Sequence, residues 1–309
     1  MSPAISAVVC THNRAAYLER ALASLAAQSL ARDAYEILVV DNASTDDTPA
    51  VVAAARARIP NLVALHEPTP GLGHARNAGL RAARGAYVAY VDDDAVASPA
   101  WLARILAAFA TVQPAPGCVG GRVDAIWEAP RPGWLADELL PYLTVIDWSP
   151  TATFLGEDRF VAGANMAFPR DLLRAIDGFH PALGRRGTNL LSNDELRVEA
   201  TLRRRGHPCW YDPAIAVGHH VSPERLTRGY FRRRCFWQGV SDAQLVLLDA
   251  APSARERGVR LARQLRRAFG PRACLRLLGG ATGAERFRRR CEALRELGFT
   301  GGLLAARLR

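Results

Sequence analysis

The stretch Ala86-Tyr-Val-Ala-Tyr-Val-Asp-Asp-Asp94 decides the fold class. Its first six residues form a short apolar run, which is typical of a strand buried on both faces of a sheet. Three consecutive carboxylates follow, and such a cluster is costly to bury unless a cation compensates its charge. We therefore expect a buried strand that ends at a polar, functional edge of a sheet.

Strand-like and helix-like runs alternate along the rest of the chain. Strands are expected at residues 5–10, 36–40, 61–66, 120–124, 160–168 and 210–211 with 214–217, and helices at residues 16–28, 74–83, 98–113, 193–205 and 223–248. Strand–helix repeats with short turns predict an α/β fold with a mostly parallel central sheet flanked by helices. We expect residues 1–250 to form this domain and residues 251–309 to form a helical extension.

The charge of the chain is unevenly distributed. The formal net charge is +10, but residues 251–309 hold 15 Arg and 4 acidic residues, a net +11, so the first 250 residues sum to −1 (10 minus 11). Such a basic segment can contact anionic lipid, nucleic acid or an acidic partner, or it can be a solvated helical surface. The basic isoelectric point therefore describes the end of the chain and not its main domain.

Composition narrows the class of protein further. No window of about 18 apolar residues predicts a transmembrane helix, and the first residues lack the pattern of a secretory signal. The six cysteines are widely spaced and form no CxxC pair, which argues against a zinc site or a disulfide framework. A reducing, cytoplasmic location fits best.

Three polar clusters follow predicted strands, at residues 11–14, 41–46 and 92–94. Ligands of parallel α/β sheets bind beyond the carboxyl ends of the strands, so we expect these clusters to form one site. Asp92 and Asp94 can point the same way while the chain is extended, and paired carboxylates suit Mg²⁺ or Mn²⁺. The alternative is an acidic turn that caps the next helix.

Other polar residues have two interpretations each. Asp41 can accept the imide N–H of a pyrimidine base or can simply make a turn. The glycine-containing loop at residues 71–73 precedes a helix with Arg76, which could pair with a phosphate or with a carboxylate of the site.

A second group of candidates lies further along the chain. Asp194 and Glu195 open a predicted helix, where acids favour the helix dipole, but either could be a general base for an acceptor hydroxyl. His219 can complete a metal site, although a histidine here could equally be a core or surface residue.

Taken in order, these segments resemble the family 2 inverting glycosyltransferases with a GT-A fold, the nucleotide-diphospho-sugar transferase fold. The resemblance covers about residues 5–240. The matching stretches are Val8-Val-Cys-Thr-His-Asn13, Val39-Val-Asp-Asn-Ala-Ser-Thr-Asp46, Ala75-Arg-Asn-Ala-Gly79, Tyr90-Val-Asp-Asp-Asp94, Gly163-Ala-Asn-Met-Ala-Phe168 and Gly178-Phe179.

The resemblance implies roles for individual residues. The nucleotide would be bound by the set Thr11, Asn13, Asp41, Arg76, Asp92 and Asp93. The metal, Mn²⁺ or Mg²⁺, would be held by Asp94, Asp92 and His219. The general base would be Glu195, with Asp194 as its rival, because many relatives carry Glu-Asp where this chain carries Asp-Glu.

The resemblance also implies an activity. It predicts transfer of a sugar from a nucleotide-diphosphate donor, with UDP or dTDP favoured, to a polysaccharide, lipid-linked or small-molecule acceptor. Residues 1–98 would be the nucleotide-binding half and residues 99–250 the acceptor-binding half. The stretch Arg232-Arg-Arg-Cys-Phe-Trp237 resembles a loosened acceptor-side motif of the family, which makes processive polymer synthesis less expected. We expect the basic segment to contact anionic membrane and not nucleic acid.

Two other functions compete with this one. A sugar-1-phosphate nucleotidyltransferase also binds nucleotide and metal, but it would carry a glycine-rich, basic loop after the first strand, where this chain has Thr11-His-Asn-Arg14. A non-catalytic, membrane-associated scaffold is the second alternative. The intact acidic residues Asp92, Asp94 and Glu195 argue against it.

Overall fold

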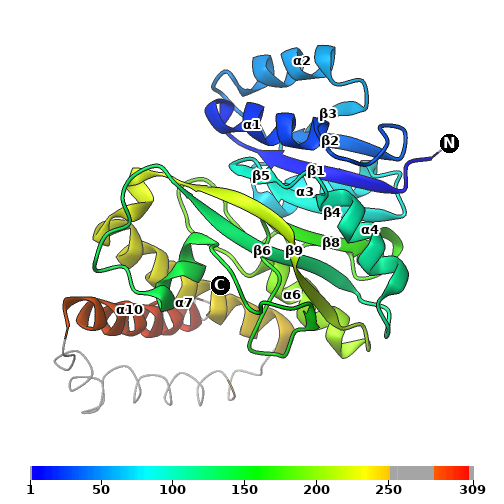
Figure 1. Cartoon of the computed structure of the whole chain (residues 1–309). Helices are drawn as coiled ribbons and strands as arrows, with labels where there is room; N and C mark the ends of the chain where they lie inside the picture. Colours follow the sequence, from blue (N-terminus) through cyan, green and yellow to red (C-terminus); the bar gives the residue numbers. More distant parts are fainter. Residues whose placement is uncertain (1, 251–255, 257–281, 306–309) are drawn as a thin grey trace. The chain divides into compact units, whose positions relative to one another are not determined.

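The computed structural model describes residues 2–250, 256 and 282–305 (Figure 1). These residues form two compact units. The first unit comprises Met1–Ile126, Thr144–Ala182 and Asp194–His220, and the second comprises Trp127–Leu143, Leu183–Asn193 and Val221–Arg309. The boundary at residue 250 that the sequence suggested stays a prediction.

The first unit holds the sheet and the helices around it. Its described strands are β1 (Ile5–Thr11), β2 (Tyr35–Asp41), β3 (Leu62–His66), β4 (Tyr87–Asp92), β5 (Ala95–Ala97), β6 (Cys118–Trp127), β7 (Thr153–Phe154), β8 (Asn165–Pro169) and β9 (Cys209–Val221). Its described helices are α1 (Ala15–Ala26), α2 (Thr48–Arg58), α3 (Leu72–Ala82), α4 (Trp101–Thr111), α5 (Arg170–Arg174) and α6 (Asp194–Arg204).

The described strands form one sheet in the order β3-β2-β1-β4-β8-β6-β9-β5, with β7 paired to β9. Strands β3, β2, β1 and β4 are parallel, as the strand–helix repeats predict. Strand β8 runs antiparallel to β4 and to β6, and β5 runs antiparallel to β9. The α/β fold class predicted from the sequence is confirmed, and the antiparallel pairs all lie on one side of β4.

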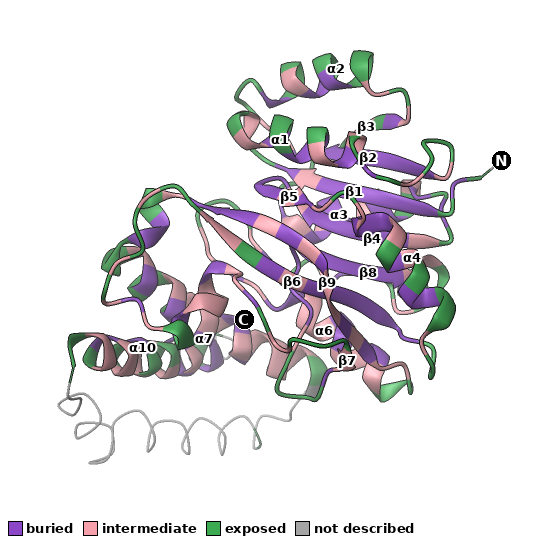
Figure 2. Ribbon diagram, in the orientation of Figure 1, coloured by how far each residue is buried: buried purple, intermediate pink, exposed green. Residues whose placement is uncertain are grey.

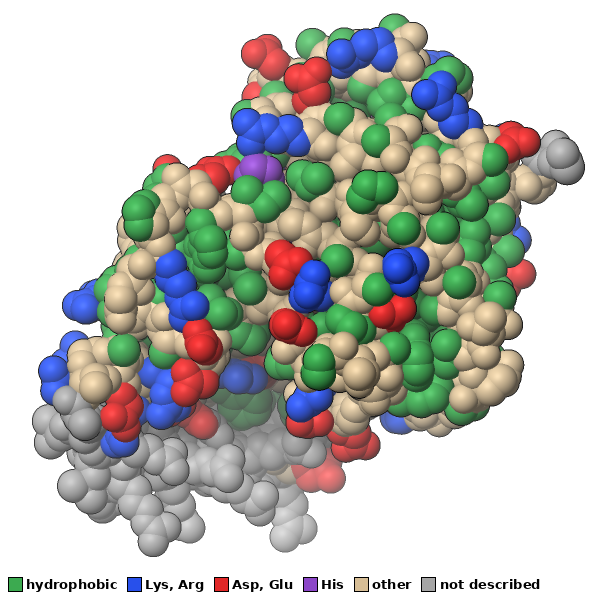
Figure 3. Space-filling view, in the orientation of Figure 1, with side chains coloured by type: hydrophobic (Ala, Val, Ile, Leu, Met, Phe, Trp, Pro, Cys, Tyr) green, Lys and Arg blue, Asp and Glu red, His purple; other side chains and the backbone are tan. Residues whose placement is uncertain are grey.

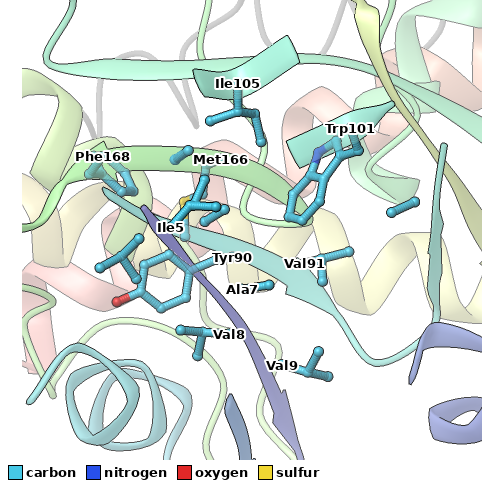
Figure 4. Packing of buried hydrophobic residues seen from close by; sticks show 14 of the residues in the cluster. Ile5, Ala7, Val8, Val9, Tyr90, Val91, Trp101, Ile105, Met166 and Phe168 are labelled. Carbon is cyan, nitrogen blue, oxygen red and sulfur yellow. The ribbon is translucent and has the colours of Figure 1, made fainter. Parts of the chain in front are cut away.

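The central strands are apolar because helices cover them (Figure 2). Val8 of β1 and Tyr90 of β4 are register partners, and the Tyr90 hydroxyl donates a hydrogen bond to a carbonyl of α3. A Cβ atom at Gly79 of α3 would lie 2.5 Å from Val8, so only glycine lets this helix approach so closely. Trp101 and Ile105 of α4 pack into the same buried cluster (Figure 4).

Two parts of the sheet differ from the sequence-based expectation. The strand expected at residues 160–168 begins only at Asn165, because the Val161 N–H donates to the Glu199 side chain instead of a neighbouring strand. Strand β5 was not expected at all. It follows directly on Asp94 and lies between the acidic triplet and the helix expected from residue 98.

The second unit is helical in its described part. It contains the 3-10 helices η1 (Asp137–Leu143) and η2 (Pro223–Leu226) and the α-helices α7 (Arg228–Ala250) and α10 (Gly283–Ala305). Helices α7 and α10 approach closely, because a Cβ atom at Gly239 would lie 1.8 Å from the Arg295 carbonyl oxygen. The sequence predicts a helix from residue 223. In the structure the α-helix begins at Arg228, because residues 223–226 form the 3-10 helix η2. The other helices expected after residue 251 lie outside the described residues.

The longest described helices, α7 and α10, have 23 residues each. None of the described helices combines the length and the apolar character that crossing a membrane requires.

Candidate active site

Polar residues lie at the carboxyl ends of three adjacent strands of the first unit, β1, β2 and β4. Thr11 of β1 is in register with Asp41 of β2, and Cys10 of β1 is in register with Asp92 of β4. The strands are parallel, so their carboxyl ends meet at one edge of the sheet. The structure therefore brings the three polar clusters together at that edge.

Asp92, Asp94 and His219 form a group that can hold a metal ion. One ligand atom from each lies within 4.8 Å of the others. The antiparallel pairing of β5 with β9 brings them together, because Ala95 is the register partner of His219. His219 Nε2 lies 3.1 Å from Asp94 Oδ1. Two carboxylates and an imidazole match the ligand preferences of Mn²⁺, and Mg²⁺ also accepts carboxylate oxygens, so these residues fit a divalent ion.

Arg14 partly compensates the negative charge of this group. Its Nη1 lies 3.2 Å from Asp94 Oδ2. The neighbouring carboxyl of Asp93 is buried, and burial together with the charge of Asp94 raises its pKa to about 7, against the opposing effect of Arg14. Part of this shift comes from the negative charge of Asp94, and a cation bound here would offset that charge.

Arg76 connects this group to the start of α6. Its side chain is 4% exposed, and its Nη1 lies 2.5 Å from Asp194 Oδ2. Its Nη2 donates to the Gly163 carbonyl at 3.3 Å and lies 3.8 Å from Asp92 Oδ1. Burial alone would lower the pKa of Arg76, but the carboxylates of Asp194 and Asp92 outweigh it and raise the pKa. Arg76 thus holds two carboxylates, and its contact with a nucleotide stays a prediction.

Asp194 and Glu195 are neighbours in different environments. Asp194 is 2% exposed and is paired with Arg76. Glu195 is partly exposed. Its burial, together with the charge of Asp194, raises its pKa to about 8, although Arg76 opposes the shift. A carboxylate with a raised pKa is a stronger base, so Glu195 is the better suited of the two to accept a proton.

The remaining predicted nucleotide residues lie around the ends of β1 and β2. Thr11 is buried, and its hydroxyl has no hydrogen-bond partner among the described residues. Asp41 accepts a hydrogen bond from the Ser44 N–H at 3.1 Å. Asn13 is exposed, has a φ of 54°, and accepts hydrogen bonds from the N–H groups of Thr45 and Asp46. Asn13 therefore fixes the loop after β2, which is a structural contact in addition to its predicted one.

Two residues of this region had no role in the sequence-based interpretation. Arg14, described above, stands in the polar stretch after β1, but nothing local predicts its pairing with Asp94. Asn42 is buried, donates to the carbonyls of Glu67 and Thr69, and accepts from the Gly71 N–H. It thereby fixes the loop before α3. Its signal in the sequence is only that of a turn-forming residue.

Comparisons with known proteins identify the family of this chain. The model of glycosyl transferase family 2 matches residues 6–176. A glucosyl-dolichyl phosphate glucuronosyltransferase from Haloferax volcanii is 25% identical over 247 residues, which cover 79% of this chain and 78% of the relative.

Solved structures show the same fold. The mannosyltransferase PcManGT from Pyrobaculum calidifontis, in complex with GDP-Man and Mn²⁺, superposes with a TM-score of 0.62 at 22% identity, covering 100% of this chain and 87% of PcManGT. TarS from S. aureus, in complex with UDP, gives a TM-score of 0.55 at 17% identity, covering 98% of this chain and 91% of that one. Because the family model spans more than half of the sequence, the chain belongs to glycosyl transferase family 2, and its fold is the GT-A fold.

Proposed function

We propose that this glycosyltransferase moves a sugar from a nucleotide-diphosphate donor to an acceptor hydroxyl with inversion at the anomeric carbon. One observation carries the proposal. Arg76 connects Asp92, which belongs to the metal-binding group, to Asp194 at the start of α6, beside the candidate base Glu195. These ion pairs support the proposal that donor binding and proton acceptance would occur next to each other in the first unit.

The donor would lie along the carboxyl ends of β1, β2 and β4. Thr11 and Asp41 would contact the base and ribose, and the Asp41 carboxylate can accept the imide N–H of uracil or thymine. This favours UDP or dTDP, as in the TarS complex with UDP, whereas PcManGT was solved with GDP-Man. Asn13 and Asp93 would support the same nucleotide-binding region.

Asp92, Asp94 and His219 would hold Mn²⁺ or Mg²⁺. When bound, such an ion neutralises the charge that develops on the leaving diphosphate. The structural neighbour PcManGT was solved with Mn²⁺, which supports manganese as the first ion to test.

Glu195 would accept the proton of the acceptor hydroxyl. As its carboxylate takes this proton, the acceptor oxygen forms a bond to the anomeric carbon and the bond from that carbon to the diphosphate breaks. A single displacement of this kind inverts the configuration. Asp194 would be the positioning residue, because its carboxylate is already bound to Arg76.

The acceptor is proposed to be a carbohydrate, lipid-linked or small-molecule hydroxyl compound. A lipid-linked acceptor is supported by the name of the Haloferax volcanii relative, which acts on a glucosyl-dolichyl phosphate. The basic residues 251–309 would then contact the cytoplasmic face of an anionic membrane. On the face shown in Figure 3, arginine and acidic side chains are interspersed. That face therefore offers no continuous basic patch for an anionic membrane.

A screen of nucleotide sugars tests the proposed function. Thermal stabilisation and donor hydrolysis would be measured for UDP-, dTDP- and GDP-sugars with Mn²⁺. We expect one nucleotide class to stabilise the protein and to be hydrolysed, and Glu195→Gln to lower turnover at least about 100-fold while stabilisation by the nucleotide remains.

Asp194→Asn is the matched comparison for Glu195→Gln, because it changes the neighbouring carboxyl in the same way. It should lower protein stability, since it breaks the buried pair with Arg76. Full turnover by Glu195→Gln, together with loss of turnover in a folded Asp194→Asn, would reverse the assignment of base and positioning residue. The absence of stabilisation by every nucleotide would reject the proposed function itself.

A further inference from the structure

The guanidinium of Arg76 is held on its edges and also on its face. Its Nη1 pairs with Asp194, and its Nη2 donates to the Gly163 carbonyl and lies near Asp92. The N–H groups of a guanidinium point outward in its plane, so these contacts act on its edges. On the face, the guanidinium carbon lies 5.2 Å from the ring centroid of Phe179. The proposed reaction depends on the ion pairs, and this ring contact has no assigned role in it.

The ring of Phe179 is fixed by other aromatic side chains. Phe179 is fully buried, and its ring packs edge-on against those of Tyr90 and Phe168, with centroids 5.2 and 6.1 Å away. Tyr90 and Phe168 lie in the buried cluster of the first unit (Figure 4). The Tyr90 hydroxyl also donates to the backbone carbonyl of Arg76 at 3.2 Å. One aromatic group therefore contacts both the backbone and the side chain of Arg76.

Asn77, the residue after Arg76, fixes the backbone of Phe179. Its Nδ2 donates to the Phe179 carbonyl at 2.7 Å, and its Oδ1 accepts from the Phe179 N–H at 2.9 Å. Gly178 has a φ of 64°, and a Cβ atom there would clash with Asn77 Oδ1, so glycine is required before the ring. Two consecutive residues of α3 thus contact Phe179, which lies 102 residues beyond Asn77.

The guanidinium has little room to move away from the ring. A Cβ atom added at Gly163 would lie 2.5 Å from Arg76 Nη2. The Arg76 side chain is only 4% exposed, so water hardly competes for its charge. The attraction between a cation and the face of an aromatic ring is strongest where both are removed from water. The contact with Phe179 is therefore one of the forces that orient this guanidinium.

We propose that Phe179 is a positioning residue of the transferase, whose ring holds the Arg76 guanidinium in the orientation that pairs with Asp194. Without the ring, the guanidinium could tilt and lose part of this pairing. Asp194 directly precedes the proposed base Glu195, so a tilted Arg76 would disturb the base without removing it. The inference rests on the proposed function, because it gives Phe179 a part in the same site. All these residues lie in the first unit.

Turnover and urea unfolding of Phe179→Leu and Phe168→Leu test this role. Phe168 is the matched control, because it is equally buried and packs against Tyr90 as Phe179 does. In the described part of the chain, no arginine lies over the Phe168 ring. Both variants should lose similar stability, since each removes a buried ring. We expect Phe179→Leu to lower kcat at least about tenfold and Phe168→Leu to lower it less than about threefold.

A fluorinated ring separates the electrostatic contact from packing. Trifluorinated phenylalanine nearly keeps the shape of the ring but withdraws negative charge from its face, which weakens the attraction to a cation. In place of Phe179 it should lower both the urea midpoint and kcat relative to the same replacement of Phe168. A ring that only fills space would give equal changes at the two positions.

Two results would overturn the inference. One is an equal change of the urea midpoint for the fluorinated ring at the two positions, a comparison that does not depend on turnover. The other is a kcat of Phe179→Leu no lower than that of Phe168→Leu, measured where the wild type is active. A wild type without turnover on any donor would instead reject the proposed function, while the midpoints would still report whether the ring of Phe179 holds Arg76.

Discussion

At the scale of single residues, the two acids at the start of α6 have different surroundings. Asp194 is buried and forms an ion pair with Arg76, while Glu195 is partly exposed and has a pKa raised to about 8. A carboxyl group with a raised pKa suits proton transfer, whereas one held in a buried ion pair suits positioning. The Asp-Glu order, which left the base open in the sequence, thus acquires a physical interpretation.

The raised pKa of Glu195 predicts a pH dependence of turnover. The base is protonated and inactive below its pKa, so kcat/KM should rise with pH and level off above about pH 8. Initial rates between about pH 6 and about pH 9.5 measure the profile. A flat profile, with chemistry shown to limit the rate, would remove Glu195 as the base.

The same shift predicts an effect on stability. The pKa of Glu195 in the folded state lies above its unfolded value of 4.5, so the wild type loses stability as pH rises from there to about 8. Glu195→Gln carries no such penalty and should be more stable than the wild type at pH 8 by about 1 kcal/mol or more. Urea unfolding at pH 4 and pH 8 measures it, and the advantage should vanish at pH 4.

At the scale of secondary-structure elements, Asn165 at the start of β8 connects three neighbours. It accepts a hydrogen bond from the Trp101 indole of α4 at 2.8 Å. Its Nδ2 donates to the carbonyls of Arg122 in β6 and Ile215 in β9. The side chain is fully buried, so these bonds replace water for all four groups.

Asn165→Leu should destabilise the first unit strongly. It keeps a similar volume but leaves an indole N–H and two carbonyls without partners, which should lower the free energy of unfolding by about 3 kcal/mol or more. Asn61→Leu is the control, because the partly exposed Asn61 also donates to two carbonyls, and water can replace it there. Urea denaturation compares the two variants, and equal losses would contradict the special role of Asn165.

The success of the sequence-based prediction also differs from element to element. Strands β1, β2 and β4 were predicted to within one or two residues, because burial on both faces leaves a continuous apolar run in the sequence. The strand β5 was missed because three residues, Ala-Val-Ala, carry no period of their own. Their strand conformation comes from pairing with β9, which lies more than a hundred residues further along the chain.

At the scale of the whole molecule, local sequence could identify the site only in part. Runs of acids at strand ends predicted the residues of one sheet edge. The ion pair between Arg76 and Asp194 joins positions 118 residues apart, and neither residue carries a local signal of the other.

Metal-dependent donor binding is the most direct test of the central claim, that the carboxylates at the edge of the sheet hold a divalent ion and the donor's diphosphate. Calorimetric titration of UDP and GDP into the wild type and Asp94→Asn, with Mn²⁺ or with EDTA, measures it. We predict that Mn²⁺ strengthens binding of one nucleotide at least about tenfold in the wild type and that Asp94→Asn loses this gain. Equal affinity with Mn²⁺ and with EDTA, or an unchanged gain in Asp94→Asn, would contradict the claim.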